Sequence, residues 1–110
     1  MPDNIRQFRK LPVEIMAAEF TGLIEPAREI LGWITMCGGT ARFVGPGTPH
    51  ELRREDEQFA AAFLVIDTLE GPHRADIGDW IIRGVAGEFY PCKADIFDRT
   101  YEAVDEESDA

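Results

Sequence analysis

The sequence predicts an α+β fold, in which a single small domain is built mainly from an antiparallel sheet of five or six strands with one main helix. Three observations predict it. The chain has 110 residues, the usual size of one domain. One segment, residues 26–37, has apolar residues at helical spacing. Several shorter apolar segments are separated by glycine-rich turns, which is typical of antiparallel strands.

The first elements are a strand and the main helix. A polar leader at residues 1–10, which we expect to be flexible, precedes a strand predicted at residues 12–20. The helix at residues 26–37 follows, because a first helical turn tolerates Pro26 and the apolar residues then recur every three or four positions. Gly38 supplies a helix end.

The middle of the chain predicts two strands around a loop. Residues 40–44 resemble a short strand. Residues 45–57 are rich in glycine, proline and charge, without periodicity, and predict an exposed loop. In the second half of residues 59–68, the side chains that would point to either face of a strand are apolar. This is expected of a central strand that is covered on both faces. Residues 69–74 predict a turn.

A β-hairpin is predicted in the last third of the chain. Its strands are residues 79–83 and 88–93, and its turn is residues 84–87, where two glycines allow a positive φ. Pro91 cannot donate a hydrogen bond to a neighbouring strand, so the second strand lies at an edge of the sheet or ends there.

The C-terminal elements complete one domain. Residues 94–99 predict a short helical turn, and residues 100–104 a last strand. Residues 105–110 hold four acids and no base, and predict a disordered acidic tail. The sequence therefore predicts one α+β domain at residues 1–104.

Charge and cysteine content restrict the function classes. A formal net charge of −10 repels phosphate backbones and anionic lipids, so we expect neither nucleic acid nor membrane as a partner. No apolar run approaches the roughly 20 residues that cross a bilayer, and no signal peptide is evident. We expect a cytoplasmic protein in which Cys37 and Cys92 are free thiols.

Five strings in the second half carry a resemblance: TLEG at 68–71, GDWIIRG at 78–84, GEFYPCK at 87–93, DIF at 95–97 and TYE at 100–102. With these strings the chain resembles a family of small proteins of phages and prophages of actinobacteria. The resemblance extends over nearly all residues from 9 to 104. It implies a phage-encoded accessory protein in the cytoplasm of an infected bacterial cell, and it carries over no functional residue.

The predicted hairpin also holds the candidate ligand or interaction surface. The residues are Trp80, Arg83, Glu88, Tyr90 and Lys93. Aromatic rings could stack on a partner and cations could bind an anion. The structural alternative is a solvent-facing row of cross-strand ion pairs, such as one between Arg83 and Glu88.

The sequence predicts neither a catalytic nor a metal site. A nucleophilic role for Cys92 would need a nearby base, and Lys93 would point to the opposite face of the strand. The spacing of Cys37, His50, His73 and Cys92 contains none of the close pairs typical of zinc sites. We therefore expect no enzyme activity, no metal and no cofactor.

Two function classes lead, ahead of an enzyme of unrecognised type and a purely structural role in the phage particle. The first is a protein that acts by binding a host or phage protein, or a second copy of itself, to modulate the host or to counter its defence. The exposed strand edge that Pro91 indicates favours this class, because unpaired edges recruit partners. The alternative is a small-molecule or nucleotide-binding protein of the sponge type, which Trp80, Arg83, Tyr90 and Lys93 favour.

Overall fold

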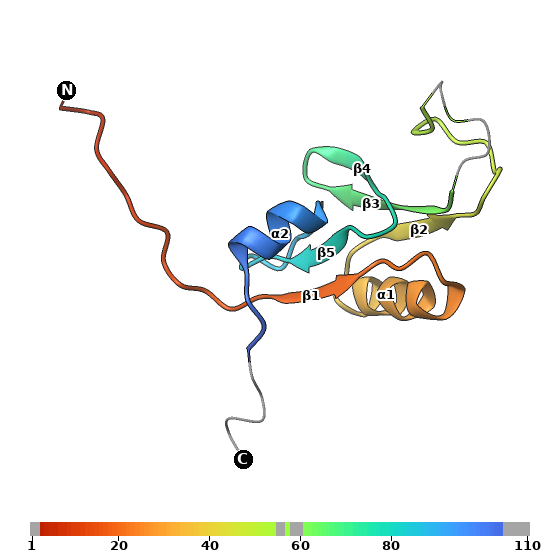
Figure 1. Ribbon diagram of the computed structural model, residues 1–110, viewed down its shortest axis with the longest axis horizontal. Helices are drawn as coiled ribbons and strands as arrows, with labels where there is room; N and C mark the ends of the chain where they lie inside the picture. The colour runs from red at the N-terminus through yellow and green to blue at the C-terminus, as the bar shows by residue number, and fades with distance from the viewer. Residues whose placement is uncertain (1–2, 55–56, 58–60, 105–110) are drawn as a thin grey trace, which may run out of the picture.

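The computed structural model describes residues 3–54, 57 and 61–104, and these form one small α+β domain (Figure 1). The predicted fold class is confirmed. In chain order the elements are β1 (Met16–Glu19), α1 (Ile24–Met36), β2 (Ala41–Val44), β3 (Phe63–Thr68), β4 (Gly71–Ala75), β5 (Trp80–Arg83), β6 (Phe89–Cys92) and α2 (Ala94–Thr100). Within the described residues the strands divide into two antiparallel sheets, ordered β1-β5-β6 and β2-β3-β4.

The predicted main helix is α1, and the structure shows why it ends where it does. Its buried residues Ala27, Ile30 and Ile34 lie on one face, as the spacing of apolar residues predicts. Gly38 has a φ of +87°, and the N–H of Gly39 donates to the carbonyl of Ile34 at 2.9 Å. This is the glycine-dependent end that satisfies the last free carbonyls of a helix.

Strand β3 is the central strand that the sequence predicts. Leu64 and Ile66 point into the main core, which α1 covers, whereas Phe63 and Val65 form a second apolar cluster on the opposite face. Leu52 packs against this second cluster. The described part of the predicted exposed loop at residues 45–57 therefore covers part of this face.

The turn predicted at residues 69–74 is wrong. Strand β4 occupies Gly71–Ala75 and pairs with β3, with Thr68 opposite Gly71. The turn is shorter, because Gly71 takes a φ of +104° and the Thr68 hydroxyl donates to its carbonyl at 2.8 Å. Sequence reasoning missed this strand because its residues GPHRA lack an alternating apolar pattern.

The second hairpin is confirmed. Strands β5 and β6 pair with Ile82 opposite Tyr90, and Gly87 turns the chain with a φ of +86°. Strand β6 is the last strand of its sheet, as Pro91 predicts. Strand β6 also lies close to β3 and β4, and a hollow of about 360 Å³ is lined by residues 88–91 together with residues 68–70 and His73.

The two ends of the domain differ from the prediction. The first strand begins at Met16 rather than at residue 12. Helix α2 continues to Thr100, and residues 101–104 form no strand, so the prediction of a last strand at residues 100–104 is wrong. The predicted acidic tail at residues 105–110 lies outside the described residues. Neither helix of the described chain is long and apolar enough to cross a bilayer.

The sheet of β1, β5 and β6 lies between the two helices. On one face Ala18 and Ile81 contact the core beneath α1, together with Phe89. Ala17 and Ile82, which are opposite each other, point to the other face, where Ala17 and Phe97 of α2 line the same hollow. This arrangement places β1 at the free side of a sheet that is covered above and below.

Candidate functional site

Strand β1 has an unpaired side, which we call the β1 edge and which consists of the outward backbone groups of Ala17 and Glu19. Within the described chain β1 pairs with β5 alone. The N–H of Phe20 donates to the carbonyl of Asp79 at 2.9 Å, so Phe20 faces β5. Because successive residues of an antiparallel strand alternate between inward and outward backbone groups, Ala17 and Glu19 offer theirs to solvent.

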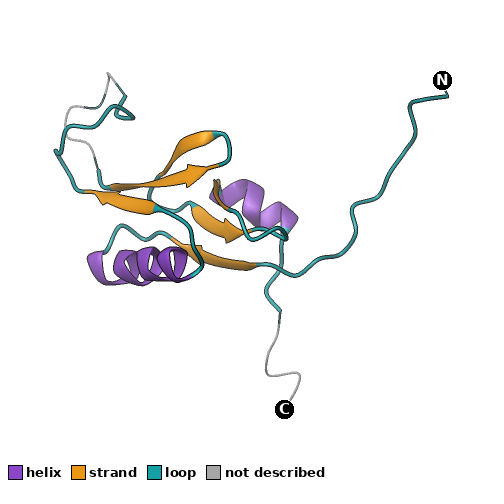
Figure 2. Ribbon diagram, turned by 180° about the vertical axis from the view of Figure 1, so that it is seen from behind, coloured by secondary structure: helices purple, strands orange, loops and turns teal. Residues whose placement is uncertain are grey.

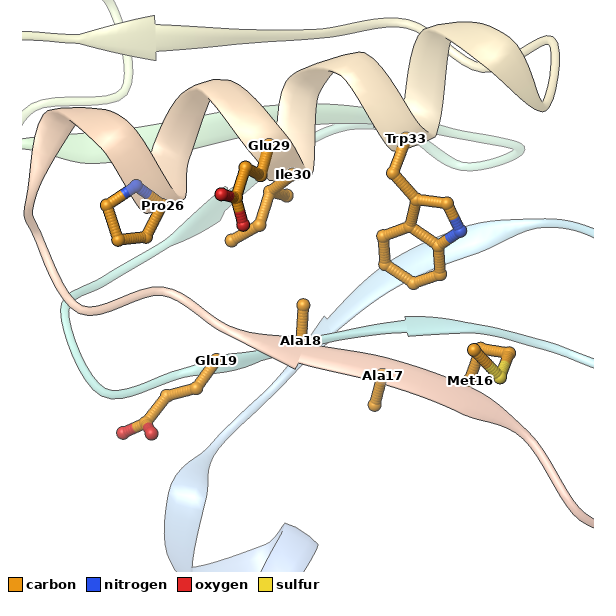
Figure 3. Close-up of a pocket in the computed structure, with 8 residues that line it drawn as sticks. All are labelled: Met16, Ala17, Ala18, Glu19, Pro26, Glu29, Ile30 and Trp33. Carbon is orange, nitrogen blue, oxygen red and sulfur yellow. The ribbon is translucent and has the colours of Figure 1, made fainter.

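A hollow of about 320 Å³ lies between β1 and α1, and we call it the α1-side hollow (Figure 3). Ala18 points into it from β1, and Ile30 and Trp33 line it from α1. Most of its lining is apolar, and two acidic residues, Glu19 and Glu29, also border it, although the Glu19 side chain points away from α1 (Figure 3). An apolar side chain with a cationic neighbour would fit this chemistry.

A second hollow of about 640 Å³ lies on the opposite face of β1, and we call it the α2-side hollow. Its floor is aromatic. The rings of Trp80 and Phe97 stack with centroids 4.2 Å apart and planes 4° apart, and Tyr101 follows at 5.0 Å from Phe97. Glu14 and Glu102 also line it. This hollow would accept a large apolar side chain.

The two hollows and the β1 edge form a single site. In an extended peptide, successive side chains point to opposite faces. A segment that added to the β1 edge would therefore place alternate side chains in the α1-side and α2-side hollows. Backbone groups would supply affinity and the two hollows selectivity, which is how peptides are recognised by strand addition.

Two of the five predicted surface residues belong to this region. Trp80 lines the α2-side hollow, and Tyr90 lies on the same face of the sheet, opposite Ile82. Burial and a hydrogen bond with Tyr101 raise the pKa of Tyr90 to about 12. Tyr90 therefore stays neutral at physiological pH and ties the C-terminal segment to the sheet.

Arg83 and Glu88 lie elsewhere. Arg83 is opposite Met16 and Phe89, so it occupies the other face from Trp80. Its Nε is buried and has no hydrogen-bond partner in the part of the chain that the structure describes. The cross-strand ion pair predicted between Arg83 and Glu88 is not among the ion pairs of the described residues, and Glu88 Oε1 accepts the N–H of Ala86 at 3.2 Å.

Lys93 serves the structure at the end of β6. Its Nζ lies 3.1 Å from Asp79 and 3.2 Å from Asp76, and Asp79 is 5% exposed. Hydrogen bonds to these carboxylates raise the pKa of Lys93. Lys93, one of the two cations that the nucleotide alternative requires, is therefore already paired with Asp76 and Asp79.

Sequence reasoning missed the ionic network around β4. Arg74 pairs with Glu57 at 2.5 Å and with Asp76 at 2.6 Å, and its guanidinium lies 4.1 Å from the Phe63 ring centroid. Burial would raise the pKa of Asp76, but hydrogen bonds from Arg74 and Lys93 outweigh it and lower that pKa. No sequence signal joins these residues, because they are up to 36 positions apart and meet only through the strand pairing.

Neither cysteine shows the environment of a nucleophile. Burial and the nearby carboxylates of Asp79 and Asp95 raise the pKa of Cys92, which disfavours its thiolate. Cys37 is half-buried against the main core. Among the residues that the structure describes, no three histidine, cysteine or acidic side chains are grouped as metal ligands.

The comparisons with known proteins add no relative. No protein-family model, no curated protein and no solved structure matches this chain.

Proposed function

We propose that this chain is a non-enzymatic binding protein that captures an extended segment of another protein by adding it as a strand to the β1 edge. The observation that carries the proposal is the coincidence of three features at β1. Its backbone is unpaired on one side within residues 3–54, 57 and 61–104, and a hollow lies on each of its faces. Unpaired edges are normally blocked or covered in proteins that do not use them.

The residues that line the two hollows indicate which kind of partner segment would bind at the β1 edge. Glu19 and Glu29 line one hollow, and Glu14 and Glu102 line the other. The chain as a whole carries a net charge of −10. A segment with one apolar residue for each face, separated by an odd number of positions, and with Lys or Arg beside them would complement both the hollows and this charge.

The resemblance to small proteins of actinobacterial phages supplies the proposed context. In that context the chain is a phage-encoded accessory protein in the cytoplasm of an infected bacterial cell, and the captured segment belongs to a host or phage protein. The nucleotide alternative has less support, because Lys93 is paired with Asp76 and Asp79, and Arg83 lies on the face opposite Trp80.

Titration with synthetic peptides tests the proposal. The probe is a peptide in which adjacent Val-Phe pairs, with one side chain for each hollow, are flanked by Lys, and a peptide with Glu in place of Lys is its control. Binding is measured by calorimetry and by the fluorescence of Trp33 and Trp80, which line the two hollows. We expect the basic peptide to bind and the acidic one to fail.

A matched pair of variants at Glu19 separates backbone pairing from charge. Glu19→Pro removes the outward N–H, whereas Glu19→Ala keeps it and removes only the carboxylate. We expect Glu19→Pro to weaken binding at least about tenfold, since it removes a backbone hydrogen bond and disturbs the added strand. Glu19→Ala should weaken binding less than about fivefold, as for an exposed charge pair. Equal effects of the two variants, or no binding of the basic peptide, would contradict strand addition.

A further inference from the structure

The N-terminal segment of the chain, residues 3–13, is an extended arm that leaves the domain. Figures 1 and 2 show it running away from the two sheets. Its apolar side chains are exposed: Ile5 is 56%, Phe8 78%, Leu11 77% and Val13 50% accessible. Its interactions with the body lie at the end nearest β1, where Lys10 makes a cation–π contact with Tyr101 at 5.6 Å and Pro12 and Val13 line the α2-side hollow. A row of apolar side chains exposed in this way is typical of a segment that binds a partner surface.

The arm has the chemistry that the β1 edge requires. Residues 3–10 carry three bases and one acid, a net charge of +2, so the rest of the chain carries −12. The bases Arg6, Arg9 and Lys10 stand between the apolar residues. The arm is therefore apolar and basic, as is the segment proposed for the two hollows and their acidic side chains.

The course of the arm favours a second copy, rather than its own domain, as the partner of this segment. The arm leads directly into β1, and to pair with its own β1 it would have to reverse between residues 11 and 15. In the structure residues 11–15 form no turn, and the arm runs away from the two sheets (Figure 1 and Figure 2). A second copy related by a two-fold axis meets no such obstacle, because each arm then runs antiparallel beside the partner's β1 in one self-complementary interface.

The length of the arm also fits. At about 3.4 Å per residue, residues 5–13 extend over roughly 30 Å, more than the roughly 14 Å of the four residues of β1. The arm can therefore cover the β1 edge and both hollows of the partner.

We propose that two copies of this chain exchange their arms, so that residues 3–13 of one copy become a fourth strand at the β1 edge of the other. This inference rests on the proposed function and names one partner for the same site. In this dimer the arm of one copy occupies the β1 edge of the other. A host or phage segment of similar chemistry must displace the arm before it can bind there.

Sedimentation analysis of the full chain over a wide range of concentrations tests the inference. The wild-type chain should be a dimer that dissociates on dilution. Phe8→Asp combined with Leu11→Asp should raise the dimer dissociation constant at least about 100-fold, because each dimer buries two copies of both side chains. Leu69→Asp is the matched control: it is the same change at a side chain that is 95% exposed in the turn between β3 and β4, and it should leave the dimer intact.

Charge reversal provides a rescue that a merely destabilised chain would not show. Arg6→Glu with Arg9→Glu should weaken the dimer, and adding Glu19→Arg and Glu29→Arg to the same chain should restore it. Glu19→Pro should also dissociate the dimer. A monomer at every concentration, or a dimer that persists in the Phe8 and Leu11 variant or in Glu19→Pro, would overturn the inference.

Strand addition and the exchange of arms can be disproved independently of each other. If the wild-type chain is monomeric but the basic probe peptide binds at β1, the exchange of arms is wrong and strand addition stands. If the probe does not bind the Phe8 and Leu11 variant, whose edge is open, strand addition itself is wrong. If both are right, excess probe peptide should convert the wild-type dimer into monomers.

Discussion

The two edge strands of one sheet, β1 and β6, differ in how their open sides are treated. Strand β6 lies against β3 and β4, Pro91 removes one of its outward donors, and Lys93 anchors its end to Asp76 and Asp79. Strand β1 has none of these features in the described chain. A hollow lies on each face of β1, whereas the hollow at β6 is shared with His73 of β4 and the turn between β3 and β4.

This difference indicates where the molecule can accept a partner. An unpaired edge promotes aggregation unless it is blocked, and proteins commonly block edges with proline, charge or covering segments. This chain blocks one edge of a three-stranded sheet in these ways and leaves the other open. We infer that the open edge has a use, and the predictions below test the contrast between the two.

The largest expected effect is at the blocked edge. Lys93→Ala would leave Asp79 buried without its cation, so we expect a loss of about 2 to 3 kcal/mol of stability, toward the low end because half of Lys93 is exposed. Chemical denaturation measures this loss. Glu19→Ala, at the open edge, should change stability by less than about 0.5 kcal/mol. Similar losses in both variants would mean that the two edges do not differ.

A smaller effect should appear at alkaline pH. The pKa of Tyr90 is raised from 10.0 to about 12, so its neutral form is favoured in the folded state. Its contribution is complete below about pH 10 and is lost as the pH rises toward 12. Allowing for its partial exposure, we expect a loss of about 1 to 2 kcal/mol over this range.

Comparison with Tyr90→Phe isolates this contribution, because the phenylalanine variant cannot ionise at that position. The difference in stability between the two proteins should shrink between pH 10 and 12. A difference that stays constant over this range would show that Tyr90 is not tied to Tyr101 in the folded chain.

The sequence predicts the blocked edge better than the open one. Pro91 is a local signal, since it lacks an N–H wherever it stands, and the glycines around the β5–β6 turn are equally local. The α1 helix is predictable for the same reason, from apolar spacing and Gly38. Strand β4 is not, because its residues GPHRA take their conformation from pairing with β3.

The candidate site depends on long-range packing, which explains why sequence reasoning found only part of it. Trp80 is an aromatic residue in a predicted strand, and so it was identifiable. Its stacking partner Phe97 and the segment of residues 12–15 reach the same hollow only after α2 folds over the sheet. The order of strands, which leaves β1 at an edge of its sheet, likewise cannot be predicted from any local sequence pattern.

Amide hydrogen exchange at single-residue resolution tests the central claim most directly. The comparison is made in the Phe8→Asp and Leu11→Asp variant, before and after addition of the basic probe peptide. The account predicts that the outward amides of Ala17 and Glu19 on β1 become protected, whereas the outward amide of Phe89 on β6 does not change. Protection that is absent at β1, or equal on the two strands, would contradict it.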